Sequence, residues 1–165
     1  MAPQVLIRPL QAPGEAELCA RLMAESDPWL TLRRGYNHAF TLLTDPTRES
    51  YVAIVDGAVV GFVVVNLVGP LRGYLQAIGV LPAWRSRGVG QELIAFAEER
   101  IFRECPNVFL LVSSFNLGAQ RLYARLGYVQ VGELKDYAIK GHSELLMRKT
   151  LGPLADFQPR ARGDA

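Results

Sequence analysis

The stretch of sequence that decides the fold is IGVLPAWRSRGVG, residues 78–90. Its apolar start predicts the end of a strand, and apolar residues recur at helical spacing from Gly88 onward. A short loop rich in arginine and glycine therefore joins a strand to a helix. The unpaired N–H groups and the dipole at the start of that helix favour an anion, most naturally a phosphate or pyrophosphate. Arg85 and Arg87 add charge-assisted donors to this anion site.

Two common phosphate-binding motifs do not describe this loop. The chain lacks G-x-x-x-x-G-K-[ST], and the G-x-G-x-x-G pattern fails because Leu93 occupies its last position. A strand of the dinucleotide-binding type also opens its domain, whereas this strand follows a hairpin.

That hairpin has β-branched arms at Tyr51–Val55 and Ala58–Val68, and Asp56-Gly57 suits its two-residue turn.

Asn116 and Gly127 suit the two ends of a later helix, Asn116 as its N-terminal cap and Gly127 as the residue after its C-terminus. The remaining elements follow from periodicity. We expect strands at Gln4–Arg8, Tyr74–Val80, Asn107–Ser113, Tyr128–Leu134 and Glu144–Arg148, and helices at 12–25, 32–43, 88–104 and 116–126. The chain is therefore predicted to be an α/β protein with a mixed sheet whose N-terminal half is antiparallel.

Composition sets the class of protein. The chain has 165 residues, 50% hydrophobic and 21% charged, which is typical of one globular domain and predicts a domain over 1–151 with a disordered tail over 152–165. No apolar run approaches the ~20 residues of a membrane helix, and no signal peptide is visible. A net charge of +2 argues against a nucleic-acid partner, and two cysteines predict free thiols in the cytoplasm rather than a metal site.

Two motifs carry a resemblance to a known family. R-x-x-G-x-G at Arg85–Gly90, after a strand ending in Ile-Gly-Val-x-Pro, resembles the acetyl-CoA loop of the GNAT superfamily of N-acetyltransferases. The segment at 116–128 resembles that family's N-x-x-A-x-x-L-Y-x-x-L-G-[FY] signature. The resemblance covers roughly Val5–Thr150 and is nearest in pattern to the ribosomal-protein alanine N-acetyltransferases.

The resemblance implies a GNAT-type fold in which the strands at 74–80 and 107–113 are a splayed parallel pair in the centre, flanked by helices. It places the pantetheine arm of acetyl-CoA in the gap, against the first strand, and the pyrophosphate on the loop amides. The cofactor-binding residues that it implies are Ile78, Gly79, Val80, Arg85, Ser86, Arg87, Gly88, Val89, Gly90, Asn116 and Tyr123. The acceptor side would hold Trp29, Tyr36, Gln76 and Tyr137.

The implied reaction is the transfer of acetyl from acetyl-CoA to a primary amine of a small molecule or of a peptide or protein N-terminus, without a metal. In this reaction Tyr123 is the catalytic acid. A phenol with a pKa of about 10 can protonate a thiolate whose conjugate acid has a pKa of about 8.5 as charge develops. An acetyl-CoA-binding sensor or pseudoenzyme, and transfer from a longer acyl-CoA, are the alternatives. The protein is expected to be a monomer or a homodimer, with no membrane partner.

The proton acceptor is the least defined part of the site. Leu111 stands where the ribosomal-protein enzymes carry a glutamate, and Tyr74 stands where other members place one. An ordered water near Gln76 is therefore one route for the proton, and His38 or His142 is another. Without a strong base, an α-amine is the easier acceptor, since its neutral form costs about 1 kcal/mol at pH 7 against roughly 4–5 kcal/mol for lysine. Asp136, Tyr137 and Glu144 are candidates to bind the ammonium or a peptide.

Overall fold

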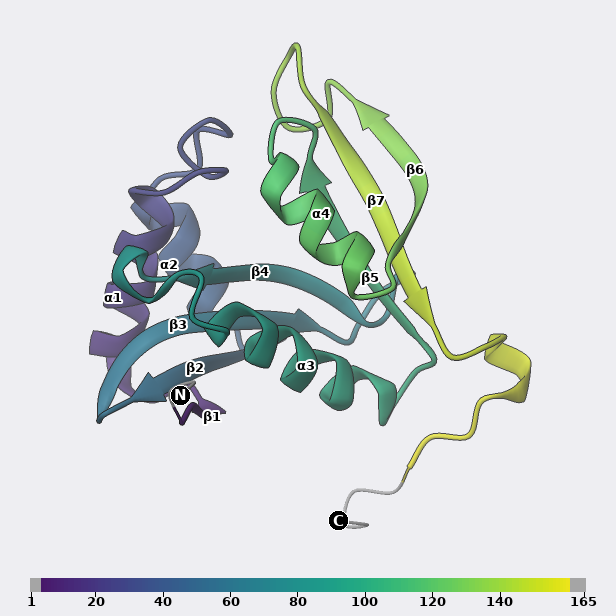
Figure 1. The fold of residues 1–165 in the computed structure, drawn as a ribbon, viewed down its shortest axis with the longest axis horizontal. Helices are drawn as coiled ribbons and strands as arrows, with labels where there is room; N and C mark the ends of the chain where they lie inside the picture. Colours follow the sequence, from purple (N-terminus) through teal and green to yellow (C-terminus); the bar gives the residue numbers. More distant parts are fainter. Residues whose placement is uncertain (1–3, 161–165) are drawn as a thin grey trace.

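A computed structural model describes residues 4–160. Its seven strands form one sheet in the order β1-β2-β3-β4-β5-β7-β6. Helices α1 and α2 cover one face, and α3 and α4 cover the other (Figure 1). The bounds are β1 Leu6–Pro9, α1 Ala12–Ala24, α2 Tyr36–Thr44, β2 Glu49–Val55, β3 Ala58–Asn66, β4 Tyr74–Val80, α3 Val89–Phe102, β5 Asn107–Ser113, α4 Leu117–Arg125, β6 Val129–Lys135 and β7 Ser143–Thr150, with short 3-10 helices at Pro82–Trp84 and Leu154–Asp156.

The order of helices and strands confirms the α/β prediction, and the hairpin turn has positive φ at both Asp56 and Gly57. The second helix was predicted to begin near residue 32, and this is wrong. Arg33 has a φ of 55° in the left-handed region, and Gly35 is the N-cap, so the helix begins at Tyr36. Leu32 is buried, but it lies in a turn before the helix, and its N–H donates to the carbonyl of Pro28.

Central strands are buried on both faces, which explains why β3 reads as a continuous apolar run. Val63 and Val65 belong to the core under α3 and α4, whereas Phe62 and Val64 belong to the core under α1 and α2. The alternation is the period of two that a strand imposes. Two separate cores therefore hold the sheet from opposite sides.

The sheet opens between its two parallel strands. β4 and β5 pair at one position, Tyr74 with Phe109, and the N–H of Phe109 donates to the carbonyl of Gly73 over 2.9 Å. Beyond that point the strands diverge, so the two halves of the molecule form the V that is visible in Figure 1. The predicted splayed pair is thereby confirmed.

A glycine is required at the apex of the V. Gly73 has a φ of 87°, and a Cβ built on it would lie 2.2 Å from the carbonyl oxygen of Asn107. The approach of these two backbones is closer than any side chain allows. Gly73 therefore fixes where β4 and β5 meet and where they part.

A β-bulge lies just after this apex. Val64 pairs with Ala77 and Val65 pairs with Leu75, so Gln76 has no partner residue on β3. A bulge leaves the extra residue outside the ladder and turns its side chain. Gln76 borders the gap between β4 and β5.

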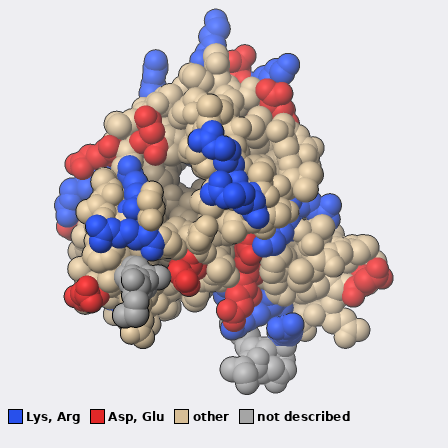
Figure 2. Space-filling model, viewed as in Figure 1, with Lys and Arg blue, Asp and Glu red and all other residues tan. Residues whose placement is uncertain are grey.

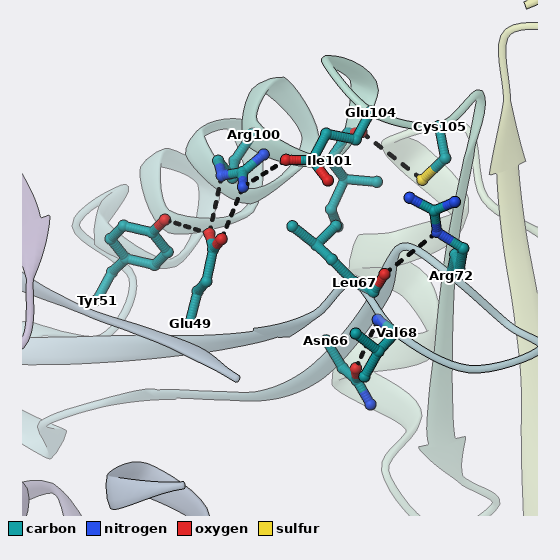
Figure 3. A network of polar contacts seen from close by, with 10 residues as sticks. All are labelled: Glu49, Tyr51, Asn66, Leu67, Val68, Arg72, Arg100, Ile101, Glu104 and Cys105. Carbon is teal, nitrogen blue, oxygen red and sulfur yellow. Dashed lines mark hydrogen bonds and ion pairs between the residues drawn. The ribbon is translucent and has the colours of Figure 1, made fainter. Parts of the chain in front are cut away.

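Polar contacts attach α3 to strand β2 of the sheet (Figure 3). The guanidinium of Arg100 donates to both carboxylate oxygens of Glu49 on β2, over 2.8 and 2.6 Å, and to Glu104 over 2.7 Å. The hydroxyl of Tyr51 donates to the same Glu49. The network fixes the C-terminal half of α3 against β2, and so supports the helix whose N-terminus faces the gap.

The C-terminal residues as far as 160 follow the surface of the domain. The N–H of Leu151 donates to the carbonyl of Pro106, and that of Arg160 donates to Arg103. The predicted disordered tail over 152–165 stays a prediction, and residues 161–165 lie outside the described residues. Within residues 4–160, none of the helices is both long enough and apolar enough to traverse a bilayer.

The contact at the apex predicts a specific loss of stability. Gly73→Ala should lower the free energy of unfolding by about 2–4 kcal/mol, because it adds overpacking to left-handed strain. Gly69→Ala is the matched control: Gly69 has a φ of 89°, but a Cβ there meets nothing within 4 Å, so strain alone should cost about 1 kcal/mol. Urea unfolding measures both, and equal losses would contradict the requirement for close approach.

Candidate functional site

A cavity of about 410 Å³ occupies the gap between β4 and β5. Its walls come from both strands, from α4, from the start of α3, from β7 and from the segment between α1 and α2. Figure 2 shows a hole through the molecule at this place, with Lys and Arg side chains on both sides of it. The cavity therefore connects the face of α3 and α4 with the face of α1 and α2.

Strand β4 directs free backbone groups into this cavity. The N–H of Leu81 donates to Val60 on β3, so the alternate residues Val80 and Ile78 direct their N–H and C=O groups toward the opposite edge. That edge is open because β5 has diverged. Both residues line the cavity, and Gly79 between them leaves room for the ring of Phe62, whose Cε1 would lie 2.5 Å from an added Cβ.

The loop from β4 to α3 has the geometry of an anion site. Ser86 and Gly88 have φ values of 60° and 89°, and no side chain caps the helix at Gly88. The first helical N–H groups, those of Val89, Gly90 and Gln91, have no acceptor within the helix by position. Three backbone donors and the positive end of the helix dipole thus remain for an anion.

Some members of the predicted loop have other contacts. The N–H of Arg85 donates to Pro82, and its guanidinium donates to the carbonyl of Val80 over 3.0 Å and to the hydroxyl of Ser26 over 3.3 Å. Arg85 lines the cavity, but much of its donor capacity ties β4 to the end of α1. Arg87 lies over the ring of Trp84, 5.1 Å from its centroid.

The side chain of Val89 is fully buried in the core, so only its amide is available. Among the loop residues predicted to bind the cofactor, the structure brings Arg85 and Gly90 to the wall of the cavity. Gln91 was not predicted, although its free amide follows from its place in the first turn.

Helix α4 contributes Asn116 and Tyr123. The side-chain oxygen of Asn116 accepts the N–H of Ala119 over 3.2 Å, which confirms the predicted cap, and the residue also lines the cavity. Tyr123 is 7% exposed, borders the cavity and packs edge-on against Tyr128 with 5.5 Å between ring centroids. Burial, and then the nearby Tyr74, raise the pKa of Tyr123 well above its ordinary value. Its hydroxyl is therefore protonated at neutral pH.

The acceptor side keeps three of the four predicted residues. Trp29, Gln76 and Tyr137 line the cavity. Tyr36 does not: it is the exposed first residue of α2, and its ring stacks on Phe40 with 5.9 Å between the ring centroids. Asp27, Leu32 and Arg34, from the irregular segment before α2, line the cavity instead, and no motif in the sequence marks Asp27 or Arg34 as site residues.

The amide of Gln76 is held in one orientation. Its Oε1 accepts a hydrogen bond from Nε of Arg48 over 2.5 Å, and Arg48 is paired in turn with Asp45. Because a guanidinium can only donate, the oxygen of Gln76 must face Arg48. The NH₂ end of Gln76 is left as a donor, not an acceptor, for any water in the cavity.

A carboxylate reaches the cavity from β7. Glu144 is 6% exposed, and one of its oxygens accepts the hydroxyl of Ser113 over 2.7 Å. Both residues line the cavity. Burial raises the pKa of Tyr74 to about 12, the nearby Arg34 opposes this rise, and the neighbouring Tyr137 and Glu144 add to it. Neither His38 nor His142 is among the described residues that line the cavity.

Comparison with known proteins identifies the family. Residues 15–128 match the model of the acetyltransferase (GNAT) family. The chain belongs to the GNAT family of acetyltransferases. The sheet with its parted parallel pair and the arginine–glycine loop are the features that the sequence resemblance had led us to expect.

Solved structures agree with this membership. Nourseothricin acetyltransferase is 31% identical over 66% of this chain and 68% of its own, with a TM-score of 0.59. An aminoglycoside 6'-N-acetyltransferase complexed with coenzyme A is 15% identical over 90% and 98% of the two chains, with a TM-score of 0.72. The ribosomal-protein-S18-alanine N-acetyltransferase from Escherichia coli is 15% identical over 98% and 99%, with a TM-score of 0.71. The last two show a shared fold.

Proposed function

We propose that this GNAT protein transfers an acetyl group from acetyl-CoA to a primary amine by direct attack inside the cavity. The observation that carries the proposal is the cavity itself, which joins an anion site at the start of α3 to an opening on the side of α1 and α2. Tyr123 lies in the wall of this cavity. A donor and an acceptor entering from opposite faces of the sheet would meet beside this hydroxyl.

The residues of the donor side suit acetyl-CoA. The amides of Val89, Gly90 and Gln91 would hold the pyrophosphate. The backbone groups of Ile78 and the N–H of Val80, whose carbonyl already accepts Arg85, would pair with the amides of the pantetheine arm. Pairing of the ligand amides with the β4 backbone would fix the position of the pantetheine arm along β4, as the backbone of an added strand would be fixed. The coenzyme A complex of the aminoglycoside acetyltransferase, a protein of the same fold, supports this choice of cosubstrate.

Two groups of this chain would act on the reacting atoms. The bulge leaves Gln76 outside the β3–β4 ladder, and its backbone N–H would stabilise an oxyanion on the thioester carbonyl. The Tyr123 hydroxyl, protonated at neutral pH, can donate to the sulfur as the thiolate leaves. Acetyl-CoA would supply the activated acyl group and its leaving thiol.

Turnover distinguishes the enzyme from an acetyl-CoA sensor. The panel follows the acceptors that the structural neighbours are named for: nourseothricin, an aminoglycoside and a peptide with an N-terminal alanine, together with a simple alkylamine. Release of free thiol, with mass detection of the acetylated amine, is expected for at least one of them. Thermal stabilisation by acetyl-CoA with no turnover of any amine would favour the sensor. Faster turnover with a longer acyl-CoA would identify the acyl-chain alternative.

The anion site predicts a loss of cosubstrate binding in Gly90→Glu. Acetyl-CoA at about a hundred times its Kd should stabilise the wild type by about 2.7 kcal/mol, or raise Tm by roughly 5–10 °C. A Cβ on Gly90 comes no closer than 3.8 Å to Val80, so the fold tolerates the change while the carboxylate repels the pyrophosphate. Gly14→Glu is the matched control in the first turn of α1, where an added Cβ meets nothing within 4 Å. An unchanged Tm shift in Gly90→Glu would refute the site.

The proposed acid predicts a specific loss of rate. Tyr123→Phe should keep acetyl-CoA affinity within a few-fold and lower kcat by about 10²-fold, since one proton transfer is lost. Tyr128→Phe removes a hydroxyl from the neighbouring buried ring, which does not line the cavity, and should keep kcat. Steady-state kinetics with the best amine of the panel measures both. A wild-type kcat in Tyr123→Phe would mean that Tyr123 serves packing alone.

A further inference from the structure

We propose that Glu144 is the proton acceptor for the attacking amine. The inference rests on the proposed acetyl transfer and adds to it the catalytic base, which the two strands beside the gap do not supply. On those strands Leu111, Tyr74 and Gln76 occupy the positions from which a base would reach the cavity. The carboxylate comes instead from β7, the strand next to β5.

The register of the sheet places Glu144 on the acceptor face. Met147 on β7 belongs to the core under α3 and α4, so Glu144, three residues earlier, faces the other side. Ser113 pairs with Glu144 in the ladder and faces the same side, because Val112 belongs to the same core as Met147. The carboxylate therefore lies on the face of α1 and α2, opposite to the face that carries the anion loop.

The surroundings of Glu144 hold its carboxylate in place and leave part of it available. Oε1 accepts the Ser113 hydroxyl over 2.7 Å. The structure gives Oε2 no hydrogen-bond donor within residues 4–160, and the residue lines the cavity, so Oε2 is the oxygen left for a ligand there. A buried carboxylate with one oxygen fixed and one facing a cavity is suited to receive a proton from a ligand.

Other candidates for the base fit the geometry less well. Asp27 also lines the cavity, but it is exposed, and its Oδ1 accepts both the N–H and the hydroxyl of Thr31. The oxygen of Gln76 is engaged by Arg48. The titratable and charged groups that share the cavity with Glu144 are Asp27, Arg34, Tyr74, Arg85, Tyr123 and Tyr137.

The acceptor ammonium loses one proton to Oε2 of Glu144, and the freed lone pair forms a C–N bond with the thioester carbonyl carbon. Collapse of the tetrahedral intermediate breaks the C–S bond, and the sulfur takes the proton of Tyr123. The nitrogen gives up a second proton, which restores Tyr123 through the water of the cavity, while Glu144 returns its proton to solvent. One N–H remains in the amide, and the net release is one proton.

The test is the pH profile of kcat/KM for Glu144→Gln, with the amine of the panel that turns over best among those with a pKa near that of lysine. Glutamine keeps the shape of the side chain and can accept the Ser113 hydroxyl, so the fold should be retained. Glu133→Gln is the matched control: Glu133 also accepts a serine hydroxyl over 2.7 Å, from Ser143, but it is exposed and does not line the cavity.

For the wild type and Glu133→Gln, kcat/KM should be nearly level between about pH 6 and 8, because the carboxylate deprotonates the prevailing ammonium. In Glu144→Gln, kcat/KM should be about 10²-fold lower at pH 7 and rise about tenfold per pH unit toward the pKa of the amine. The reason is that the variant cannot deprotonate a bound ammonium, so the amine must already be neutral when it binds. The rise of Tm with acetyl-CoA should be unchanged. Profiles of the same shape in Glu144→Gln and the wild type would refute the role of Glu144, whereas no turnover of any amine would refute the proposed function itself.

Discussion

The hydrogen bond from the Phe109 N–H to the Gly73 carbonyl joins β4 to β5 at the single point where they pair. Asn107 leaves no room there for a side chain on Gly73, so the strands meet closely and then separate. A continuous ladder would satisfy every backbone group of both strands. The separation instead leaves the backbone groups of Ile78 and the N–H of Val80 facing a cavity, where a ligand with amide groups can satisfy them.

The two ends of the cavity have different electrostatic characters. Backbone donors at the start of α3 and basic side chains around the hole favour an anion on one face (Figure 2). On the other face the buried carboxylate of Glu144, fixed by Ser113, favours a cation. This polarity matches a reaction in which a phosphorylated donor and an ammonium approach from opposite sides, with the buried Tyr123 hydroxyl between them.

Much of the fold could be predicted because local signals agreed with it. Asp56-Gly57 takes the two positive φ values of its turn, Asn116 caps α4, and Gly127 has the left-handed conformation expected after that helix. The segment before α2 was misassigned because Leu32 fits a helical period while Arg33 does not have helical backbone angles. Burial of an apolar residue in a turn gives the same sequence signal as burial in a helix.

The sequence by itself determined the order of helices and strands, the family, the anion loop and the place of Tyr123, because each depends on a local motif with its own backbone chemistry. Only the tertiary structure decided which side chains converge on the cavity. Gln76 is turned by its bulge and oriented by Arg48, and Arg85 is drawn to Ser26, across 59 residues of sequence. Glu144 meets Ser113 through the antiparallel register of β7 on β5, and the sequence spacing of the two residues carries no sign of that contact.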